Sequence, residues 1–291
     1  MRDPLHISSL FGVQGRTALI TGGSSGIGLM IARGLVANGC RVYITALATD
    51  PIQEVVDELR EYARSQETGS EVFGFPSDLS SLASIRSLVD HLATRETSLD
   101  MLISNAGVHL VPSIPSGPRS SALYSIQEYQ EALLSLSSES WDTTWRVNVS
   151  AHYHLSILLL PLLAVAAEKG DGRGCVIVNS SVSSRHNSTD SEQTAYASSK
   201  AATDHLVRLM AVKLARYKIR VNSINPSTFE SAMNPDPEKN GRDQKVPLKR
   251  KGIADDVTGL VIFLASRAGS YVDGENILLD GGKLLVANGQ S

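Results

Sequence analysis

The chain has 291 residues, of which 42% are hydrophobic and 20% charged, a composition typical of a folded globular protein. Its formal net charge of −3 gives no basic surface for a nucleic acid, and Cys40 and Cys175 have neither metal-ligand spacing nor a disulfide framework. No signal-peptide core follows Met1, and the longest apolar stretch, 155–167, is too short to cross a membrane. We therefore expect a cytoplasmic protein that binds no metal, membrane or nucleic acid.

Apolar runs typical of buried strands alternate along the chain with segments of helical periodicity. Continuous apolar strands separated by helices favour a parallel sheet that is covered on both faces. The sequence thus predicts an α/β fold: a single Rossmann-type doubly wound domain over 1–291 with an approximately seven-stranded parallel sheet. In chain order we predict a strand at 16–21, a helix at 29–36, a strand at 41–45, a helix from 50 through 62, a strand at 71–75, a helix capped by Ser80 through 92, a strand at 101–104, a long helix at 141–167, a strand at 174–180, a helix at 195–217, a strand at 219–224, a helix at 255–266 and a strand at 276–279.

Two segments interrupt this alternation. Residues 108–140 are rich in Ser and Pro and contain a helical patch near 126–129, and residues 227–251 are rich in Pro and charge. Ligands of doubly wound sheets bind beyond the carboxyl ends of the strands, and both segments follow such an end. We expect 227–251 to cover the substrate and 108–140 to lie near it. The apolar residues of 108–140 fit a pocket wall and an insert packed on the domain equally well.

The run from Thr21 to Gly28 lies between the first strand and the first helix. Glycines let the backbone approach phosphates closely, and a helix N-terminus supplies unpaired N–H groups and partial positive charge. The spacing is T-G-x-x-x-G-x-G rather than the general dinucleotide fingerprint G-x-G-x-x-G. This run indicates a pyrophosphate site, with an ordinary glycine-rich turn as the alternative.

Tyr196 and Lys200 are four residues apart on a predicted helix, so they share one helix face. A nearby ammonium favours a phenolate and lowers the pKa of a Tyr from about 10. A buried Tyr beside a solvated Lys is the structural alternative. Upstream, Ser181 follows the fifth predicted strand and could hydrogen-bond a substrate oxygen, with Ser183 as the alternative hydroxyl.

With these motifs in this order, the chain resembles the classical short-chain dehydrogenase/reductase family from about Gly15 to Gly282. It is most similar to ketoacyl and other carbonyl reductases, including reductases of secondary metabolism. Further motifs carry the resemblance: Ser104-Asn105-Ala106-Gly107, Trp141 followed by Val147-Asn148-Val149, Asn225-Pro226, and Asp280-Gly281-Gly282.

The resemblance implies a catalytic tetrad of Asn148, Ser181, Tyr196 and Lys200. In that family Tyr196 would exchange a proton with the substrate oxygen and Ser181 would orient that oxygen. Lys200 would lower the pKa of the Tyr and bind the nicotinamide ribose, and Asn148 would hold a relay water. The implied cofactor contacts are Gly22, Ser24, Ser25, Ile27 and Gly28 at the phosphates; Asp78 and Leu79 at the adenine; Asn105, Ala106 and Gly107 along the adenosine ribose; Pro226, Phe229 and Ser231 at the nicotinamide; and Tyr196 and Lys200.

Three positions depart from the family pattern. Ser104 replaces an Asn, Ser227 replaces a Gly, and the second strand ends in Thr45-Ala46-Leu47 without the Asp of NAD-specific members. Neither Leu47 nor Ser24 is the Arg that is common in NADP-specific members. With no carboxylate to repel a 2′-phosphate and with Ser24 and Thr45 able to donate hydrogen bonds, we predict NADP(H) and leave NAD(H) open.

The sequence therefore predicts an NADP(H)-dependent oxidoreductase that reduces a carbonyl to a secondary alcohol, or runs the reverse reaction, by hydride transfer. Its partner is expected to be an apolar small-molecule carbonyl or alcohol. The alternatives are a dehydratase, epimerase or cyclase on the same fold, or a non-catalytic nucleotide-binding scaffold. A homodimer or homotetramer is expected through the helices predicted at 141–167 and 195–217.

Overall fold

A parallel sheet of seven strands lies at the centre of the protein, with strand order β3-β2-β1-β4-β5-β6-β7. The computed structural model describes residues 3–110, 125–186, 193–229 and 246–287. The strand order reverses between β1 and β4, so the sheet is doubly wound as predicted. The strands are β1 (Thr17–Thr21), β2 (Arg41–Ala46), β3 (Val72–Pro76), β4 (Met101–Ser104), β5 (Cys175–Asn179), β6 (Arg220–Pro226) and β7 (Asn276–Leu279).

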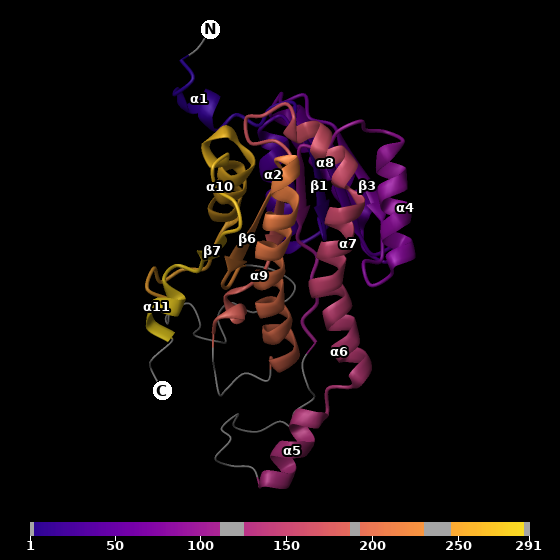
Figure 1. Cartoon of the computed structure of the whole chain (residues 1–291), viewed down its shortest axis with the longest axis vertical. Coiled ribbons are helices and arrows are strands. Elements are labelled where there is room, and N and C mark those ends of the chain that lie inside the picture. The colour runs from indigo at the N-terminus through magenta and orange to yellow at the C-terminus, as the bar shows by residue number, and fades with distance from the viewer. Residues whose placement is uncertain (1–2, 111–124, 187–192, 230–245, 288–291) are drawn as a thin grey trace.

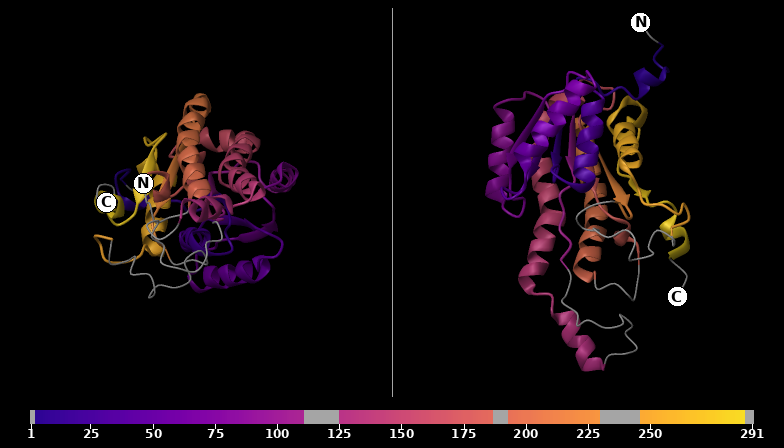
Figure 2. Two further views of the ribbon diagram at one scale, coloured as in Figure 1. Left: turned by 90° about the horizontal axis from the view of Figure 1, so that it is seen from below. Right: turned by 180° about the vertical axis from the view of Figure 1, so that it is seen from behind.

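Helices cover both faces of this sheet and produce three layers (Figures 1 and 2). Successive strand residues point to opposite faces, so Ile20 packs under one helical layer and its neighbour Leu19 under the other. This two-sided burial explains why the strands are continuous apolar runs. The first layer contains α2 (Gly26–Ala37), α3 (Ile52–Ser65) and α10 (Ala254–Ala265), and the second contains α4 (Leu82–Ala93), α7 (Ala151–Leu158), α8 (Leu160–Ala167) and α9 (Thr194–Leu214).

The N-terminus of α4 lies one residue later than predicted. Ser81, not Ser80, caps the helix, with its Oγ accepting the Ser84 N–H at 3.3 Å. The Ser80 N–H instead donates to Oδ1 of Asp78 at 2.9 Å. That side-chain turn uses Ser80 and delays the start of the helix.

The single helix predicted over 141–167 is wrong. The segment begins earlier as α6 (Ser138–Trp145), passes through a π-helical turn at Arg146–Ser150, and continues as α7 and α8. The chain bends by 61° where α8 begins. Pro161 explains this break, because its ring disfavours helical backbone in the preceding residue and it lacks an N–H to continue the hydrogen-bond ladder.

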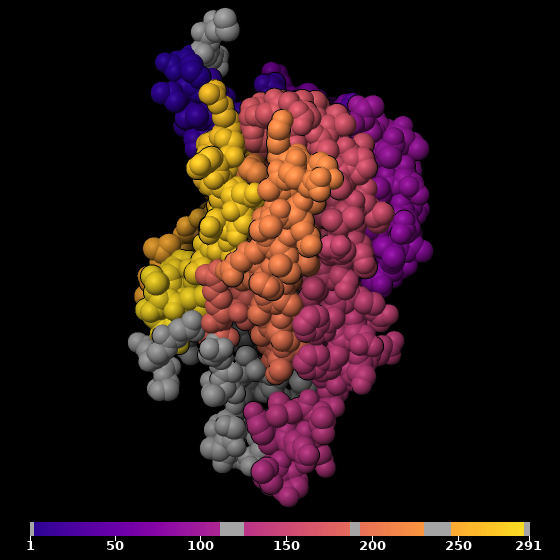
Figure 3. Space-filling view, viewed as in Figure 1, coloured from indigo at the N-terminus to yellow at the C-terminus, as the bar shows by residue number. Residues whose placement is uncertain are grey.

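No single helix in the described ranges is long and apolar enough to cross a membrane. Only the bent pair Ser138–Leu158 and Leu160–Ala167 meets the length and composition requirements, and it does so only jointly. The exposed apolar residues Tyr153 and Val165 lie on that pair, and Leu209 and Val212 lie on α9. Figure 3 shows α9 beside α6 to α8 on one face of the molecule. Oligomerisation through this face stays a prediction.

The predicted helical patch near 126–129 is confirmed as α5 (Ile126–Leu134), which starts with a capping box between Ser125 and Glu128. It lies at the end of an arm that leads from α6 away from the sheet (Figures 1 and 2). Residues 111–124 and 230–245 of the two covering segments lie outside the described residues. The short helices α1 (Ile7–Leu10) and α11 (Lys283–Ala287) carry no periodic signal strong enough to be predicted.

Candidate active site

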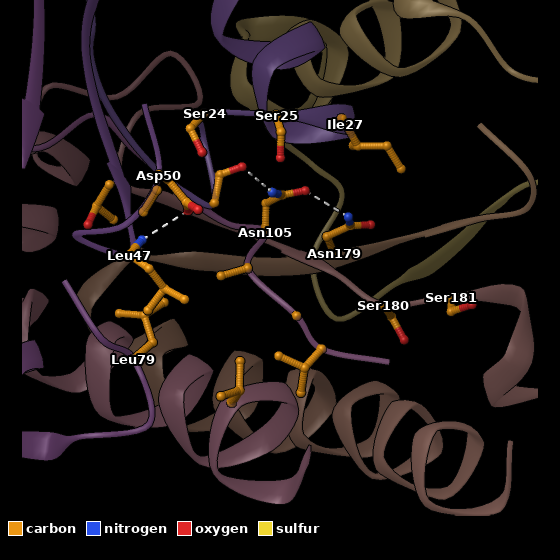
Figure 4. A pocket seen from close by; sticks show the side chains of 18 of the residues that line it. Ser24, Ser25, Ile27, Leu47, Asp50, Leu79, Asn105, Asn179, Ser180 and Ser181 are labelled. Carbon is orange, nitrogen blue, oxygen red and sulfur yellow. Dashed lines mark hydrogen bonds between the residues drawn. The ribbon is translucent and has the colours of Figure 1, made fainter. Parts of the chain in front are cut away.

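A cavity of about 460 Å³ opens at the carboxyl edge of the sheet. Its walls come from the glycine-rich turn, the ends of β2, β4, β5 and β6, and the first turns of α9 (Figure 4). This edge includes the point where the strand order reverses, which is where α/β sheets bind ligands. Fourteen residues proposed from the sequence line the cavity: Gly22, Ser24, Ser25, Ile27, Asp78, Leu79, Asn105, Ala106, Gly107, Ser181, Tyr196, Lys200, Pro226 and Phe229.

Two proposed residues, Gly28 and Asn148, do not line the cavity but support it from behind. Ser231 lies outside the described residues. Phe229 is almost fully buried and pairs with Gly252 in an isolated bridge. A Cβ at Gly252 would lie 2.2 Å from the Phe229 ring, so this glycine allows Phe229 to close one end of the cavity.

The glycine-rich turn brings the N-terminus of α2 against the end of β1. Gly22 has a φ of +61°, and a Cβ on Gly28 would lie 2.0 Å from the Gly22 carbonyl oxygen. Only glycine allows the helix to start this close to the turn. Within the described ranges no side chain caps α2, so its first N–H groups remain available to a phosphate.

Asn105 ties this turn to the neighbouring strands. Its Nδ2 donates to the carbonyl oxygens of Thr21 at 2.9 Å and Gly22 at 3.2 Å. Its Oδ1 accepts from Nδ2 of Asn179 at 2.8 Å (Figure 4). Because β1, β4 and β5 are joined through these bonds, the role in steadying the sheet that family resemblance implies for Asn105 agrees with its contacts.

Ser181 and Tyr196 both line the cavity and lie within hydrogen-bond reach of each other. A hydrogen bond from Ser181 favours the phenolate, but burial of Tyr196 is the larger influence and raises its pKa above the usual 10. The net direction is therefore a raised pKa, and the lowering by Lys200 that the family resemblance implies stays a prediction. The Ser183 hydroxyl instead lies 3.4 Å from Oε1 of Gln193, so Ser181 is the hydroxyl at the Tyr.

Lys200 is buried beneath Tyr196, with its Nζ 5.7 Å from the centre of the Tyr ring. The Nζ donates to the carbonyl oxygen of Asn179 at 2.7 Å. Burial disfavours the ammonium and lowers the pKa of Lys200 to about 8, while the negative charge of Asp204 opposes that shift. Lys200 is thus close to its titration point near neutral pH.

Asp204 also links Lys200 to the strand end that carries Ser181. Both of its carboxylate oxygens lie 2.9 Å from Nδ2 of Asn225. The same amide lies 3.2 Å from the Ser181 carbonyl oxygen and 3.1 Å from the Ser184 hydroxyl. One carboxylate therefore acts on the charge of Lys200 and on the placement of Ser181.

Asn148 sits in the π-helical turn and is fully buried. Its Nδ2 donates to the Val108 carbonyl oxygen and to Oγ of Ser199, and its Oδ1 accepts from the Val108 N–H. Both amide N–H groups are therefore used. The backbone oxygen accepts from the Thr203 hydroxyl at 2.6 Å, and the relay water that the family resemblance implies for Asn148 stays a prediction.

Ser104, which stands where the family pattern has an Asn, has a buried partner. Its Oγ lies 2.7 Å from Nδ1 of His152, and burial together with the charge of Lys200 lowers the pKa of His152 to about 3. His152 is therefore neutral at physiological pH and adds no positive charge beside Lys200. A Ser in place of the family Asn keeps this position polar.

Three buried polar atoms in the cavity wall have no hydrogen-bond partner among the described residues: Oγ1 of Thr45, Oδ1 of Asn179 and Oγ of Ser227. Buried polar groups are nearly always satisfied, so these atoms call for a polar ligand or water. They lie at the ends of three strands around the cavity, and they fit an elongated polar cofactor.

The sequence reasoning missed one charged residue of this site. Asp50 lines the cavity at the end shared by Ser24 and Leu47 (Figure 4). The expectation that no carboxylate lies there is therefore wrong. Leu47 and Asp50 are joined by two hydrogen bonds that fold the chain back after β2. The sequence did show Asp50, three residues after Leu47. We interpreted Asp50 only as the start of the helix predicted from residue 50.

Comparison with known proteins agrees with this geometry. A family model described as short chain dehydrogenase matches residues 16–241. The short-chain dehydrogenase/reductase VdtF of Byssochlamys spectabilis is 32% identical over 301 residues, which cover 96% of this chain and 95% of that protein. The rhamnolipids biosynthesis 3-oxoacyl-(acyl-carrier-protein) reductase of Pseudomonas aeruginosa is 33% identical over 278 residues, covering 94% and 97% of the two chains.

A solved structure, the Pseudomonas aeruginosa RhlG/NADP active-site complex, has a TM-score of 0.77 and 32% identity, and the match covers 94% of this chain and 98% of that one. The chain belongs to the short-chain dehydrogenase family, as its motifs predicted. It is therefore a member of an oxidoreductase family.

Proposed function

We propose that the protein is an NADP(H)-dependent carbonyl reductase that transfers a hydride to a ketone, or removes one from the corresponding secondary alcohol. The observation that carries this proposal is the presence of Ser181, Tyr196 and Lys200 around one cavity that also contains the glycine-rich turn. A solved relative of the same family is an NADP complex.

The cofactor fits the described residues in three places. The uncapped start of α2 would hold the diphosphate, and Asp78 and Leu79 would lie beside the adenine. Lys200 and the unpartnered oxygens of Asn179 and Ser227 would meet the nicotinamide half. When bound, the cofactor supplies the hydride; the protein supplies position and the proton.

Tyr196 would donate that proton. Its pKa is raised by burial, so its phenol is protonated at neutral pH and ready to protonate a developing alkoxide in the direction of reduction. Ser181 would hydrogen-bond the same oxygen and hold it at the Tyr. The ammonium of Lys200 would stabilise the phenolate that remains, and Asp204 favours that charged state of Lys200.

An apolar ketone is the proposed substrate class. Val108 and Val147 line the cavity beside Thr143 and provide apolar surface near the catalytic groups. A relative named as a 3-oxoacyl reductase supports a ketone on an aliphatic chain. Neither observation favours a particular chain length.

The test is consumption of NADPH by the purified protein with a panel of aliphatic, cyclic and aromatic ketones. Tyr196→Phe serves as the matched control because it removes only the reacting hydroxyl. Turnover by the wild-type protein and its loss in the variant are expected. A panel that gives no NADPH consumption while products of dehydration or epimerisation appear would instead favour a different task on this fold.

A further inference from the structure

The two ends of the cavity differ in charge. Among the described residues that line it, Lys200 is the only cation, and it lies at the Tyr196 end. At the opposite end the lining contains the carboxylates of Asp50 and Asp78 and the exposed side chain of Leu47. In dinucleotide-binding folds the end of the second strand faces the adenosine ribose, and a nearby Arg accommodates the 2′-phosphate of NADP.

Asp50 is held at this end by backbone geometry. Its Oδ2 accepts the Leu47 N–H at 3.1 Å, and its own N–H donates to the Leu47 carbonyl oxygen at 2.9 Å. These two bonds close a turn directly after β2 and keep the carboxylate beside the strand end (Figure 4). A 2′-phosphate carries between one and two negative charges at neutral pH, so a carboxylate fixed nearby would repel it.

Thr45 supplies the second observation. It is the residue before the end of β2 and is 1% exposed, and its Oγ1 has no partner among the described residues although it lies in the cavity wall. Ser24, in the glycine-rich turn, lines the same end. Neutral hydroxyl groups are therefore available to the ribose and its substituent where a guanidinium would otherwise lie.

We propose that Asp50 is a specificity-determining residue of the cofactor site, which weakens binding of the 2′-phosphate of NADP(H), and that hydroxyl groups of Ser24 and Thr45 hold this phosphate instead of a cation. The inference rests on the proposed cofactor but not on the reaction. It predicts a protein that discriminates only weakly between NADPH and NADH.

The effect of salt on the preference for NADPH over NADH shows whether the site attracts or repels the 2′-phosphate. Salt screens charges on exposed residues, and Asp50 is exposed. A site that uses a cation loses its preference for NADPH as salt rises, because the attraction is screened. A site that repels the phosphate keeps or increases that preference. The ratio of the two dissociation constants isolates this effect, because the diphosphate and the nicotinamide are common to both cofactors.

The experiment measures dissociation constants for NADPH and NADH by fluorescence titration at low salt and at about 0.3 M salt. Asp50→Asn removes the charge and keeps an oxygen to accept the Leu47 N–H. Asp57→Asn is the matched control, because Asp57 carries the same charge on α3 and does not line the cavity. Melting temperatures confirm that both variants are folded.

At low salt, Asp50→Asn is expected to bind NADPH about three- to tenfold more tightly and NADH within about twofold of the wild-type value, with Asp57→Asn unchanged. Leu47→Arg is expected to increase NADPH affinity further. An unchanged NADPH affinity in Asp50→Asn, or a wild-type preference for NADPH that falls steeply with salt, would overturn the inference while leaving ketone reduction intact. Failure of either nucleotide to bind would overturn the proposed function as well.

Discussion

The two ends of the cavity are built on opposite principles. At the Tyr196 end the charged groups have protein partners: Lys200 donates to Asn179, and Asp204 accepts from Asn225. At the adenosine end the hydroxyl of Thr45 is buried without a partner among the described residues. The nearby carboxylate of Asp50 accepts the Leu47 N–H and pairs with no cation in the described part of the chain. Polar atoms without partners among the described residues lie at both ends, so the ends differ in their charged groups: a paired cation lies at the Tyr196 end and carboxylates without a cation lie at the adenosine end.

The largest expected effect lies at the organised end. Tyr196→Phe removes the proton donor and is expected to lower kcat for ketone reduction about a thousandfold. Affinity for NADPH, measured by fluorescence titration, should stay within about twofold, because the phenyl ring and Lys200 remain. A variant that retains wild-type turnover would show that the proton comes from another group.

Alanine substitutions of the two serines after β5 should lower kcat/KM by very different amounts. Ser181→Ala is expected to lower kcat/KM about a hundredfold, because it removes a hydroxyl that lies at the reacting oxygen. Ser183→Ala should stay within about threefold, since its hydroxyl is directed to Gln193. Steady-state kinetics on both variants would settle the assignment. The reverse order would move the substrate oxygen to Ser183.

The pH dependence tests the charge network. Lys200 has a pKa lowered to about 8, so its ammonium is present below that pH and is lost above it. We therefore expect kcat/KM for reduction to fall above about pH 8. Tyr196, His152 and Asp204 are the titratable groups that interact with or lie against Lys200, and Arg185 faces Asp204.

Asp204→Asn should move this fall in kcat/KM, the basic limb of the pH profile, to lower pH. The substitution removes the negative charge that favours the Lys200 ammonium. Asp204→Glu should restore the limb in part. A purely structural role for Asp204 would instead reduce kcat/KM equally at every pH. Measuring the full pH profile for the three proteins separates these outcomes.

The smallest effect is expected at the adenosine end. Thr45→Val should leave the free energy of unfolding unchanged or raise it by about 1 kcal/mol, because the lost hydroxyl has no partner in the described part of the chain. NADPH affinity should fall about threefold to tenfold. Thr203→Val is the contrasting variant. Its hydroxyl bonds the Asn148 and Ser199 carbonyl oxygens, so it should lose about 1 kcal/mol in a denaturant titration.

The order of elements was predictable because each strand is buried on both faces and so appears as an unbroken apolar run. About half of the cavity lining was predictable too, because most of its motifs follow a strand end and Tyr196 and Lys200 share one face of a helix. Three features were not. The hydrophobic pattern of 141–167 does not show that the helix widens into a π-helical turn, with one extra residue, at Arg146–Ser150. The raised pKa of Tyr196 depends on burial, which its motif does not encode. Asp50 reaches the cavity only because the backbone folds back at Leu47.

The π-helical turn at Arg146–Ser150 has a geometric consequence for the arm formed by α5 and α6. Each residue of an α-helix turns the chain by roughly 100° and advances it by about 1.5 Å. A turn that accommodates one additional residue therefore sets the rotational phase of everything before it relative to α7, which is packed on the sheet. Removing one residue there would swing α5 by about a quarter of a revolution around that axis. The direction in which the arm points is thus determined by the same turn that holds Asn148.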